Sequence, residues 1–436
     1  MSAEQQIEDV ELTKARKLLD ELLGVGVRVP GTAAKLPAVV RVIESLEPAG
    51  GMDFPVFPAS YAGVLDNDPP VYDLAGIVYG DAQETIRGKG RTTVTRPQIV
   101  RADRCTIDSP QSQANRTEVA FIEDAQLLPL VPQASASIPR QEGKVGKESV
   151  LRLPHRIADF RVRLSDQRDK VRLAIADFAD GNALALLRLL PTSIVFGFWD
   201  SRGEGTQPKH ARILLSRIDA FDVVPNRRHA LYSGPYSADE FATVVLERSA
   251  AGKPEEDKMG ELGYKSVPSE GLGGVQISGK IERLALISLT DIARLYCRNE
   301  QGGVAAAETN AARRYIFALA ALAEAYPRST GSHRLRSGCE LVSKSPHVVD
   351  LRGGDSTYEN GDAVKALYNN RNLLVALAAE AKSILGIPSE VGPFAVSKEA
   401  LKADFPSPAA PSPSTSPAGT PAPPAASAGR RRPKKS

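Results

Sequence analysis

The stretch "SPQSQANR" at residues 109–116 carries the side chains with which proteins usually contact a phosphate backbone. It combines hydroxyls, amides and one arginine, and Ser109 followed by Pro110 is typical of the start of a helix. The free N–H groups at a helix start and the positive end of its dipole favour anions. On the pattern alone, a capped helix with a polar outer face explains the same residues and is the commoner arrangement.

A second basic stretch, "HRIADFRVRLSD" at 155–166, predicts another helix. His155 opens it and is the best isolated candidate for acid–base chemistry. A histidine in this place is more often a helix-terminal residue or a phosphate contact. We therefore place His155 and Arg156 among candidate binding residues rather than catalytic ones.

A third stretch, "TSIVFGFWDS" at 192–201, predicts a buried strand that runs into the polar loop "SRGEGTQPKH". This loop offers Ser201, Arg202, Lys209 and His210 to a ligand, or is simply a hairpin connection. Trp199 is the single tryptophan of the chain. The apolar run before it favours a place in the core, whereas stacking on a base or ribose is the more specific alternative.

Motifs of common enzymes are missing from the sequence. There is no G-x-x-x-x-G-K-[ST], H-E-x-x-H, G-x-S-x-G or C-x-x-C, and the five histidines are far apart along the chain. We expect no catalytic residue, no metal and no cofactor.

Positive charge is segregated along a chain whose formal net charge is only +3. Residues 87–116 hold seven Lys and Arg against two Asp, and residues 140–172 hold ten against five acidic residues. The last seven residues, "RRRPKKS", add five positive charges. Basic segments on a near-neutral body suit a groove that follows phosphates, although solvated surface charge explains either segment alone.

Several elements must position these residues. We expect helices at 10–23, 182–191, 290–298, 304–326 and 362–385, and strands at 38–48, 211–224 and 275–289. Residues 49–97 predict a long irregular insertion with short strands at 71–79, and residues 225–275 predict a protruding one. We expect a single domain over 1–402, followed by a disordered Pro/Ala/Ser-rich tail with a basic end at 403–436.

Composition fits a globular protein of 436 residues with 42% hydrophobic and 25% charged residues. The apolar runs are too short for a membrane span, and the acidic N-terminal segment lacks a signal core. Three widely spaced cysteines suit a reducing compartment. We therefore expect a cytoplasmic protein.

The stretches "SPQSQANRTE", "PHRIADFRVR", "PTSIVFGFWDS…ARILLSRIDAFDVVP" and "RLRSGCELV", in this order, resemble the backbone subunit of the type I-G (formerly I-U) CRISPR effector, or Cascade. That subunit belongs to the RAMP superfamily, and the resemblance covers about residues 35–390. It implies an α+β fold: a modified RRM-like, ferredoxin-like palm with finger and thumb insertions.

The resemblance also implies a function. Copies of the protein stack along one CRISPR guide RNA in a helical filament and present the guide for pairing with double-stranded target DNA. Implied partners are a large subunit, a guide-processing subunit and a recruited helicase-nuclease. The candidate RNA-binding residues are Ser112, Gln113, Asn115, Arg116, His155, Arg156, Trp199, Ser201, Arg202, Lys209 and Arg212.

Two alternatives stay open. The first is a CRISPR RNA-processing endoribonuclease, with His155, Tyr232 or His210 as acid or base. The second is a purely structural oligomer whose basic segments are solvated faces.

Overall fold

The computed structural model describes residues 3–26, 36–63, 68–87, 93–139, 145–201, 208–232, 267–354 and 358–396. The tail predicted at 403–436 and the candidate Arg202 lie outside these ranges.

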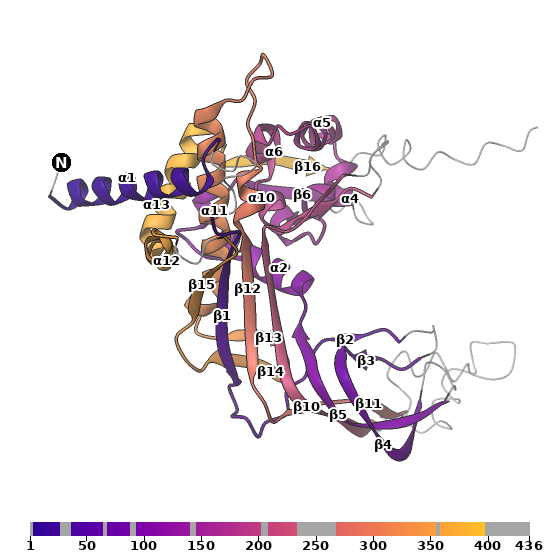
Figure 1. Cartoon of the computed structure of the whole chain (residues 1–436). Coiled ribbons are helices and arrows are strands. Elements are labelled where there is room, and N and C mark those ends of the chain that lie inside the picture. The colour runs from indigo at the N-terminus through magenta and orange to yellow at the C-terminus, as the bar shows by residue number, and fades with distance from the viewer. Residues whose placement is uncertain are drawn as a thin grey trace, which may run out of the picture.

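A nine-stranded antiparallel sheet runs through the molecule (Figure 1). Its main order is β13-β14-β1-β12-β10-β5-β4, while β15 pairs with β1 and β11 with β10. The strands are β1 (Val39–Pro48), β4 (Leu74–Arg87), β5 (Thr93–Asp108), β10 (Leu214–Tyr232), β11 (Val267–Ile277), β12 (Ile281–Ser288), β13 (His333–Arg336), β14 (Cys339–Ser343) and β15 (Val348–Arg352). Strands β11 and β12 follow one another along the same edge of β10, so that the three form one long ribbon.

The centre of this sheet has ferredoxin-like connectivity. Side by side in the sheet lie β14, β1, β12 and β10, and each is antiparallel to its neighbour. Along the chain, β1 comes first, α2 (Pro110–Glu118) and other elements follow, then β10 and β12, then α11 (Ala306–Ser329), and finally β14. The helices α2 and α11 both pack on β10. The α+β class expected from the sequence is therefore confirmed.

The helices gather at one end of the sheet, and the β4–β5 and β10–β11 ribbons extend to the other (Figure 1). The remaining helices are α1 (Ala3–Leu23), α3 (Ala120–Glu123), α4 (Phe160–Arg163), α5 (Arg168–Ala179), α6 (Leu184–Leu189), α7 (Thr192–Phe196), α10 (Leu289–Ala293), α12 (Gly361–Asn369) and α13 (Arg371–Ile384), with 3₁₀ turns η2 (Leu128–Leu130), η4 (Val150–Arg152) and η5 (Arg156–Ala158). Three small sheets pair β16 (Glu390–Ala395) with β6 (Gln133–Pro139) and β7 (Val145–Ser149), β2 (Ser60–Tyr61) with β3 (Val71–Tyr72), and β8 (Phe198–Trp199) with β9 (Lys209–His210).

Alternating burial explains the central strands. In β1 and β12 every second side chain is buried against the helices, including Val40, Val42, Ala285 and Ile287. Helix α11 crosses the middle of the main core and is buried on nearly every side from Thr309 to Glu324, because alanines let neighbouring helices approach closely. A smaller core lies beneath the outer half of the sheet.

Sequence patterning predicted most of these elements but was wrong at 192–201. Residues 192–196 form the helix α7 instead of a strand, and only Phe198–Trp199 are extended. Leu190 precedes a proline and adopts ψ 77°, which ends α6, and Pro191 then opens α7. The apolar run is buried all round, so its periodicity does not distinguish a helix from a strand.

The helix predicted over 155–166 is also wrong as a continuous element. Asp159 has extended backbone angles, and its carboxylate accepts the Arg161 N–H, so a new turn begins there. The structure therefore has η5 followed by the short α4.

The excursion predicted at 49–97 is more regular than its Gly- and Asp-rich sequence indicated. β4 pairs with β5 from Leu74 to Arg87, and register shifts near Gly80 absorb the residues that break the strand pattern. Of the insertion predicted at 225–275, residues 225–232 and 267–275 form the outer β10–β11 ribbon, and residues 233–266 lie outside the described ranges.

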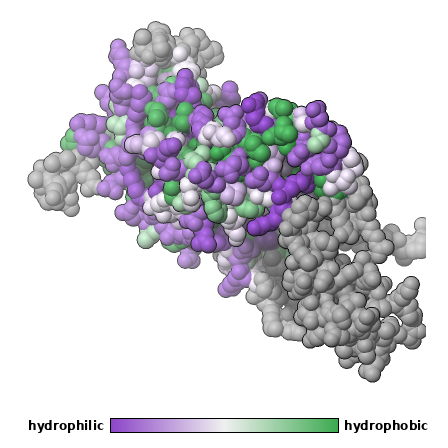
Figure 2. Space-filling model, turned by 90° about the horizontal axis from the view of Figure 1, so that it is seen from below, coloured by the Kyte–Doolittle hydropathy of each residue, from purple (hydrophilic) through white to green (hydrophobic). Residues whose placement is uncertain are grey.

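Hydrophilic residues cover most of the described part of the face seen from below, with hydrophobic residues in smaller groups between them (Figure 2). Among the described helices, none is both long and apolar enough to cross a membrane. In the same ranges, no group of three His, Cys, Asp or Glu side chains is placed to hold a metal ion.

Candidate nucleic-acid interface

Helix α2 begins as its sequence predicts. The Ser109 hydroxyl accepts the Ser112 N–H at 3.3 Å, and Pro110 occupies the first turn. Ala114 and Thr117 are buried, and Ser112, Asn115 and Arg116 stay partly exposed. The exposed side chains therefore offer a hydroxyl, an amide and a guanidinium within one and a half turns of helix.

Gln113 is buried, contrary to the expectation that it faces a guide. Its side-chain amide donates to Asp108 Oδ2 at 2.7 Å, and its oxygen accepts from the Ser216 hydroxyl at 3.1 Å and from Arg283 Nε at 3.3 Å. Only 1% of the residue is exposed. Gln113 therefore anchors α2 to the sheet, and its burial leaves no room for direct contact with RNA.

Arg116 lies at the edge of this polar cluster. Its Nε is 3.2 Å from the Ser112 hydroxyl and 3.3 Å from Asp108 Oδ2. Asp108 also accepts from Arg336 Nη2 at 2.8 Å. One carboxylate thus faces two guanidinium groups, and Arg116, with 36% of its side chain exposed, can still meet a further anion.

Arg156 is also buried, so it is not exposed for the contact with a guide that the sequence predicted. Its Nε lies 2.7 Å from Glu118 Oε2, Nη2 donates to Asn115 Oδ1 at 3.2 Å, and Nη1 reaches the Gly197 carbonyl at 3.4 Å. Its guanidinium also lies over the Phe196 ring. Arg156 therefore connects α2, η5 and the turn after α7, which the sequence places far apart.

The turn after α7 presents Trp199. Gly197 has φ +75°, and a Cβ there would lie 2.8 Å from the His210 carbonyl oxygen, so the close approach of β8 to β9 requires glycine. Trp199 pairs with Lys209 across the two strands, and Lys209 Nζ is 5.7 Å from the centre of the indole ring. Trp199 is 56% exposed, so the alternative that placed it in the core is wrong.

Arg212 follows β9, and within the described ranges no ion pair joins it to an acidic residue. It is half-buried, and its Nε has no hydrogen-bond partner among the described residues. Burial and the nearby Arg156 charge lower the pKa of Arg212. An anion placed here would relieve both effects.

The remaining histidines and polar candidates differ in accessibility. His155 and Ser201 are exposed. His210 lies against the Phe178 and Phe198 rings, with Nε2 at 3.0 Å from the Ile194 carbonyl oxygen. Burial lowers the pKa of His210, and this disfavours the charged imidazolium.

A buried ionic network supports the whole region and was missed from the sequence. Arg283 bonds Glu44 at 3.2 Å and Glu324 at 2.7 Å, and its Nε also reaches Ser216. The network connects to Gln113 and thus to α2. The sequence does contain a sign of this network. Glu44 and Arg283 stand at positions of two alternating strands where an apolar residue is expected, and they are paired across β1 and β12.

Arg156 joins α2 to the turn that carries Trp199 through its bonds to Asn115 and Gly197. We call the candidates that are at least partly exposed the α2–β8 surface: Ser112, Asn115, Arg116, His155, Trp199, Ser201, Lys209 and Arg212. Of the residues predicted from the sequence, Gln113 and Arg156 hold this surface together from beneath. It combines cations, hydrogen-bonding side chains and one exposed indole. Side chains of these kinds bind phosphates and stack on bases.

The fold and this surface define an α+β protein with a ferredoxin-like sheet and a cationic, aromatic face. Residues 40–225 match the model of a family described as "CRISPR-associated protein GSU0053 (Cas_GSU0053)". The matched span contains all eleven candidate residues and runs from β1 into β10.

A chain from a solved structure described as "Type IV-B CRISPR Complex" is 14% identical, and the alignment covers 76% of this chain and 100% of that chain, with a TM-score of 0.19. No curated protein matches the chain.

Proposed function

We propose that this protein is a non-catalytic scaffold subunit of a CRISPR effector complex, of the type I-G kind, that binds the guide RNA through the α2–β8 surface. The observation that carries the proposal is the family match over residues 40–225, because that span includes every residue of the surface. The match supports a CRISPR-associated role, and the geometry supplies the chemistry for RNA.

The surface suits a strand of any sequence. A guide-binding subunit must accept every spacer, so its contacts go to phosphates, sugars and base faces. Lys209 and Arg212 supply charge for phosphates, Ser112 and Asn115 supply groups for the 2′-hydroxyl, and Trp199 supplies a stacking platform.

In this proposal, copies of the protein stack head to tail along the guide. A heterologous contact of this kind does not close on itself and therefore builds a helical filament. The partners are the guide RNA, target DNA paired to it, a large subunit, a guide-processing subunit and a recruited helicase-nuclease.

The test is RNA retention during purification of the full chain co-expressed with a repeat–spacer transcript. We expect the wild type to carry RNA, and the double variant Trp199→Ala with Lys209→Glu to lose most of it. The matched control, Phe54→Ala with Lys17→Glu, removes an aromatic residue that is 50% exposed and reverses a lysine whose side chain is 80% exposed, and it should retain RNA. Equal retention by both variants would contradict this site, and a wild type free of RNA would favour the structural oligomer.

The structure also changes which charge reversals are informative. Arg156→Glu would place a carboxylate beside the buried Glu118, so loss of RNA in that variant would reflect misfolding. Lys209 is exposed and paired only with a ring face in the described structure, so its reversal spares the core.

The non-catalytic part of the proposal is supported by the state of His210, which is half-buried and bonded to a carbonyl. We expect labelled repeat RNA to remain intact with the purified protein, with or without Mg²⁺. Specific cleavage that disappears in His155→Ala would establish the endoribonuclease instead.

A further inference from the structure

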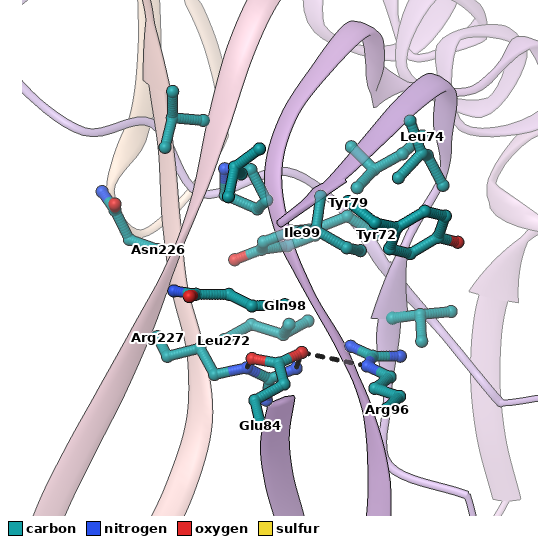
Figure 3. A pocket seen from close by; sticks show the side chains of 15 residues that line it. Tyr72, Leu74, Tyr79, Glu84, Arg96, Gln98, Ile99, Asn226, Arg227 and Leu272 are labelled. Carbon is teal, nitrogen blue, oxygen red and sulfur yellow. Dashed lines mark hydrogen bonds and ion pairs between the residues drawn. The ribbon is translucent and has the colours of Figure 1, made fainter. Parts of the chain in front are cut away.

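A second site lies away from the α2–β8 surface, at the outer end of the sheet. A cavity of about 750 Å³ opens between the β4–β5 hairpin and the β10–β11 ribbon (Figure 3). Its size falls within the range of pockets that take a small organic group. All of its lining residues belong to β3, β4, β5, β10 and β11.

One end of the cavity is aromatic and aliphatic. Tyr72, Leu74, Tyr79 and Ile99 line it, whereas Leu272 lies beyond Gln98, beside Glu84 and Arg227 (Figure 3). Tyr72 is buried and its hydroxyl accepts the Gly274 N–H at 2.9 Å, which fixes one wall. Tyr79 is 56% exposed at the sheet surface. An exposed tyrosine beside an apolar wall is an arrangement that holds a flat ring by stacking.

The other end is cationic. Glu84 lies between two guanidinium groups, with Oε2 at 2.7 Å from Arg227 Nε and Oε1 at 3.0 Å from Arg96 Nε (Figure 3). Among the described lining residues, the two guanidinium groups are accompanied by one carboxylate, so their summed charge is positive. Gln98 lies between this end and the tyrosines (Figure 3).

We propose that this cavity holds an unstacked nucleobase of a single-stranded nucleic acid. The tyrosine and aliphatic walls take the faces of the base, and the Gln98 amide, which both donates and accepts, matches its edge. The surplus positive charge favours the attached phosphate. This positive charge disfavours an apolar side chain as the occupant, and the tyrosine and aliphatic lining favours a flat base over an acidic peptide. The inference rests on the proposed function, because that function brings a single-stranded nucleic acid to the protein, but it concerns different residues.

The test pairs a variant with a change of ligand. Full-length protein and Tyr79→Ala are titrated with oligouridine, with oligothymidine and with a DNA strand whose bases are all replaced by tetrahydrofuran, each of the same length. Stacking of one base contributes about 1–3 kcal/mol, so we expect Tyr79→Ala to lower the affinity for the oligomers that carry bases about tenfold. Binding of the strand without bases should not change, because its phosphates do not use the ring.

Control variants distinguish this cavity from the rest of the protein surface. Phe54→Ala removes another exposed aromatic residue outside the cavity and should leave all three affinities unchanged. The uridine and thymidine arms show whether an RNA or a DNA strand is the better occupant. Thermal unfolding of Tyr79→Ala should match the wild type, since the residue is exposed.

Two outcomes would overturn the inference. One is an equal effect of Tyr79→Ala on strands with and without bases, or no effect on either. The other is a change in self-association by light scattering with no dependence on bases, which would assign the cavity to a protein side chain. Failure of the proposed function gives a different result in the retention experiment: either the wild type carries no RNA, or the double variant of Trp199 and Lys209 retains as much RNA as its control.

Discussion

At the residue scale, the arginines of one stretch have different roles. Arg152 pairs with Glu123 at the surface, and Arg156 pairs with Glu118 in the interior. Both belong to the same basic segment of the sequence, where they contribute equally to its charge. Only the distances show that Arg156 has no charge left for a ligand.

Arg156→Met should therefore act on stability. It leaves the Glu118 carboxylate buried without its partner, and we expect a loss of about 3–5 kcal/mol in the free energy of unfolding. Urea denaturation followed by circular dichroism measures it. The double variant Arg156→Met with Glu118→Leu removes both charges and should recover most of the loss, and a double variant as unstable as the single one would contradict this role of the ion pair.

The buried carboxylates of the central network predict acid lability. Burial alone would raise the pKa of Glu44, but His333 and Arg283 outweigh it and hold the pKa at about 2. For Glu324, Arg283 and Arg328 outweigh burial and also give a pKa of about 2. Both pKa values lie below the ordinary 4.5, so the stability they contribute is complete above pH 4.5 and is lost as the pH falls toward 2.

The size of this effect is on the order of 3 kcal/mol for each carboxylate. Unfolding free energies measured in urea between about pH 7 and pH 2.5 should fall steeply below pH 4.5. Glu44→Gln should be less stable at neutral pH and show a shallower fall. A variant with the same pH profile as the wild type would exclude Glu44 as the titrating group.

At the element scale, the β8–β9 turn depends on one glycine. Gly197→Ala would require φ +75° from alanine and would bring its Cβ within 2.8 Å of the His210 carbonyl oxygen. We expect β8 and β9 to separate, Trp199 to lose its position, and RNA affinity to fall by about tenfold, the effect of losing one stacked base. Titration of the purified variant with single-stranded RNA measures it.

Gly271→Ala is the matched control. A Cβ on Gly271 would meet nothing within 4 Å, so this change should leave RNA affinity unaltered. Equal losses in the two variants would mean that the β8–β9 turn has no particular part in binding.

Some of the helices and strands could be predicted from the sequence, and others could not. The strands β1 and β10 and the helices α1 and α11 follow patterns long enough to be predicted from periodicity. The helical region predicted at 362–385 is divided at Asn370 into α12 and α13. The helix α7 was missed because five buried residues in a row have no exposed face to mark a period. β4 was predicted only in part, because pairing with β5 extends it through residues that disfavour strands.

For the candidate site, too, some features could be predicted from the sequence and others could not. The sequence identified Ser112, Asn115 and Lys209, which the structure places at the surface, but it also selected Gln113 and Arg156, which are buried. Whether a polar side chain points outward depends on its acidic partners in the fold, and these contacts arise only when distant segments come together. The cavity at the outer sheet had no sequence signal, because its lining comes from five strands.

At the scale of the whole molecule, charge is distributed in a way that suits stacking. The formal net charge is +3 in 436 residues, and many cations of the described region are paired with acids. Copies of a strongly basic protein would repel one another along a strand, whereas a near-neutral body with a local cationic surface can place neighbours in contact. RNA then supplies the common axis of the proposed filament.

Stacking predicts stepwise protection of the guide. If each copy covers a fixed length, nuclease digestion of complexes formed on RNAs of increasing length should give protected fragments that grow in equal increments. Light scattering should show one additional protein copy for each increment. The variant Trp199→Ala with Lys209→Glu should protect little RNA at any length, and the control Phe54→Ala with Lys17→Glu should reproduce the wild-type steps. Fragments of one constant size would instead indicate isolated binding, because a strand covered by independent copies has no reason to be protected in register.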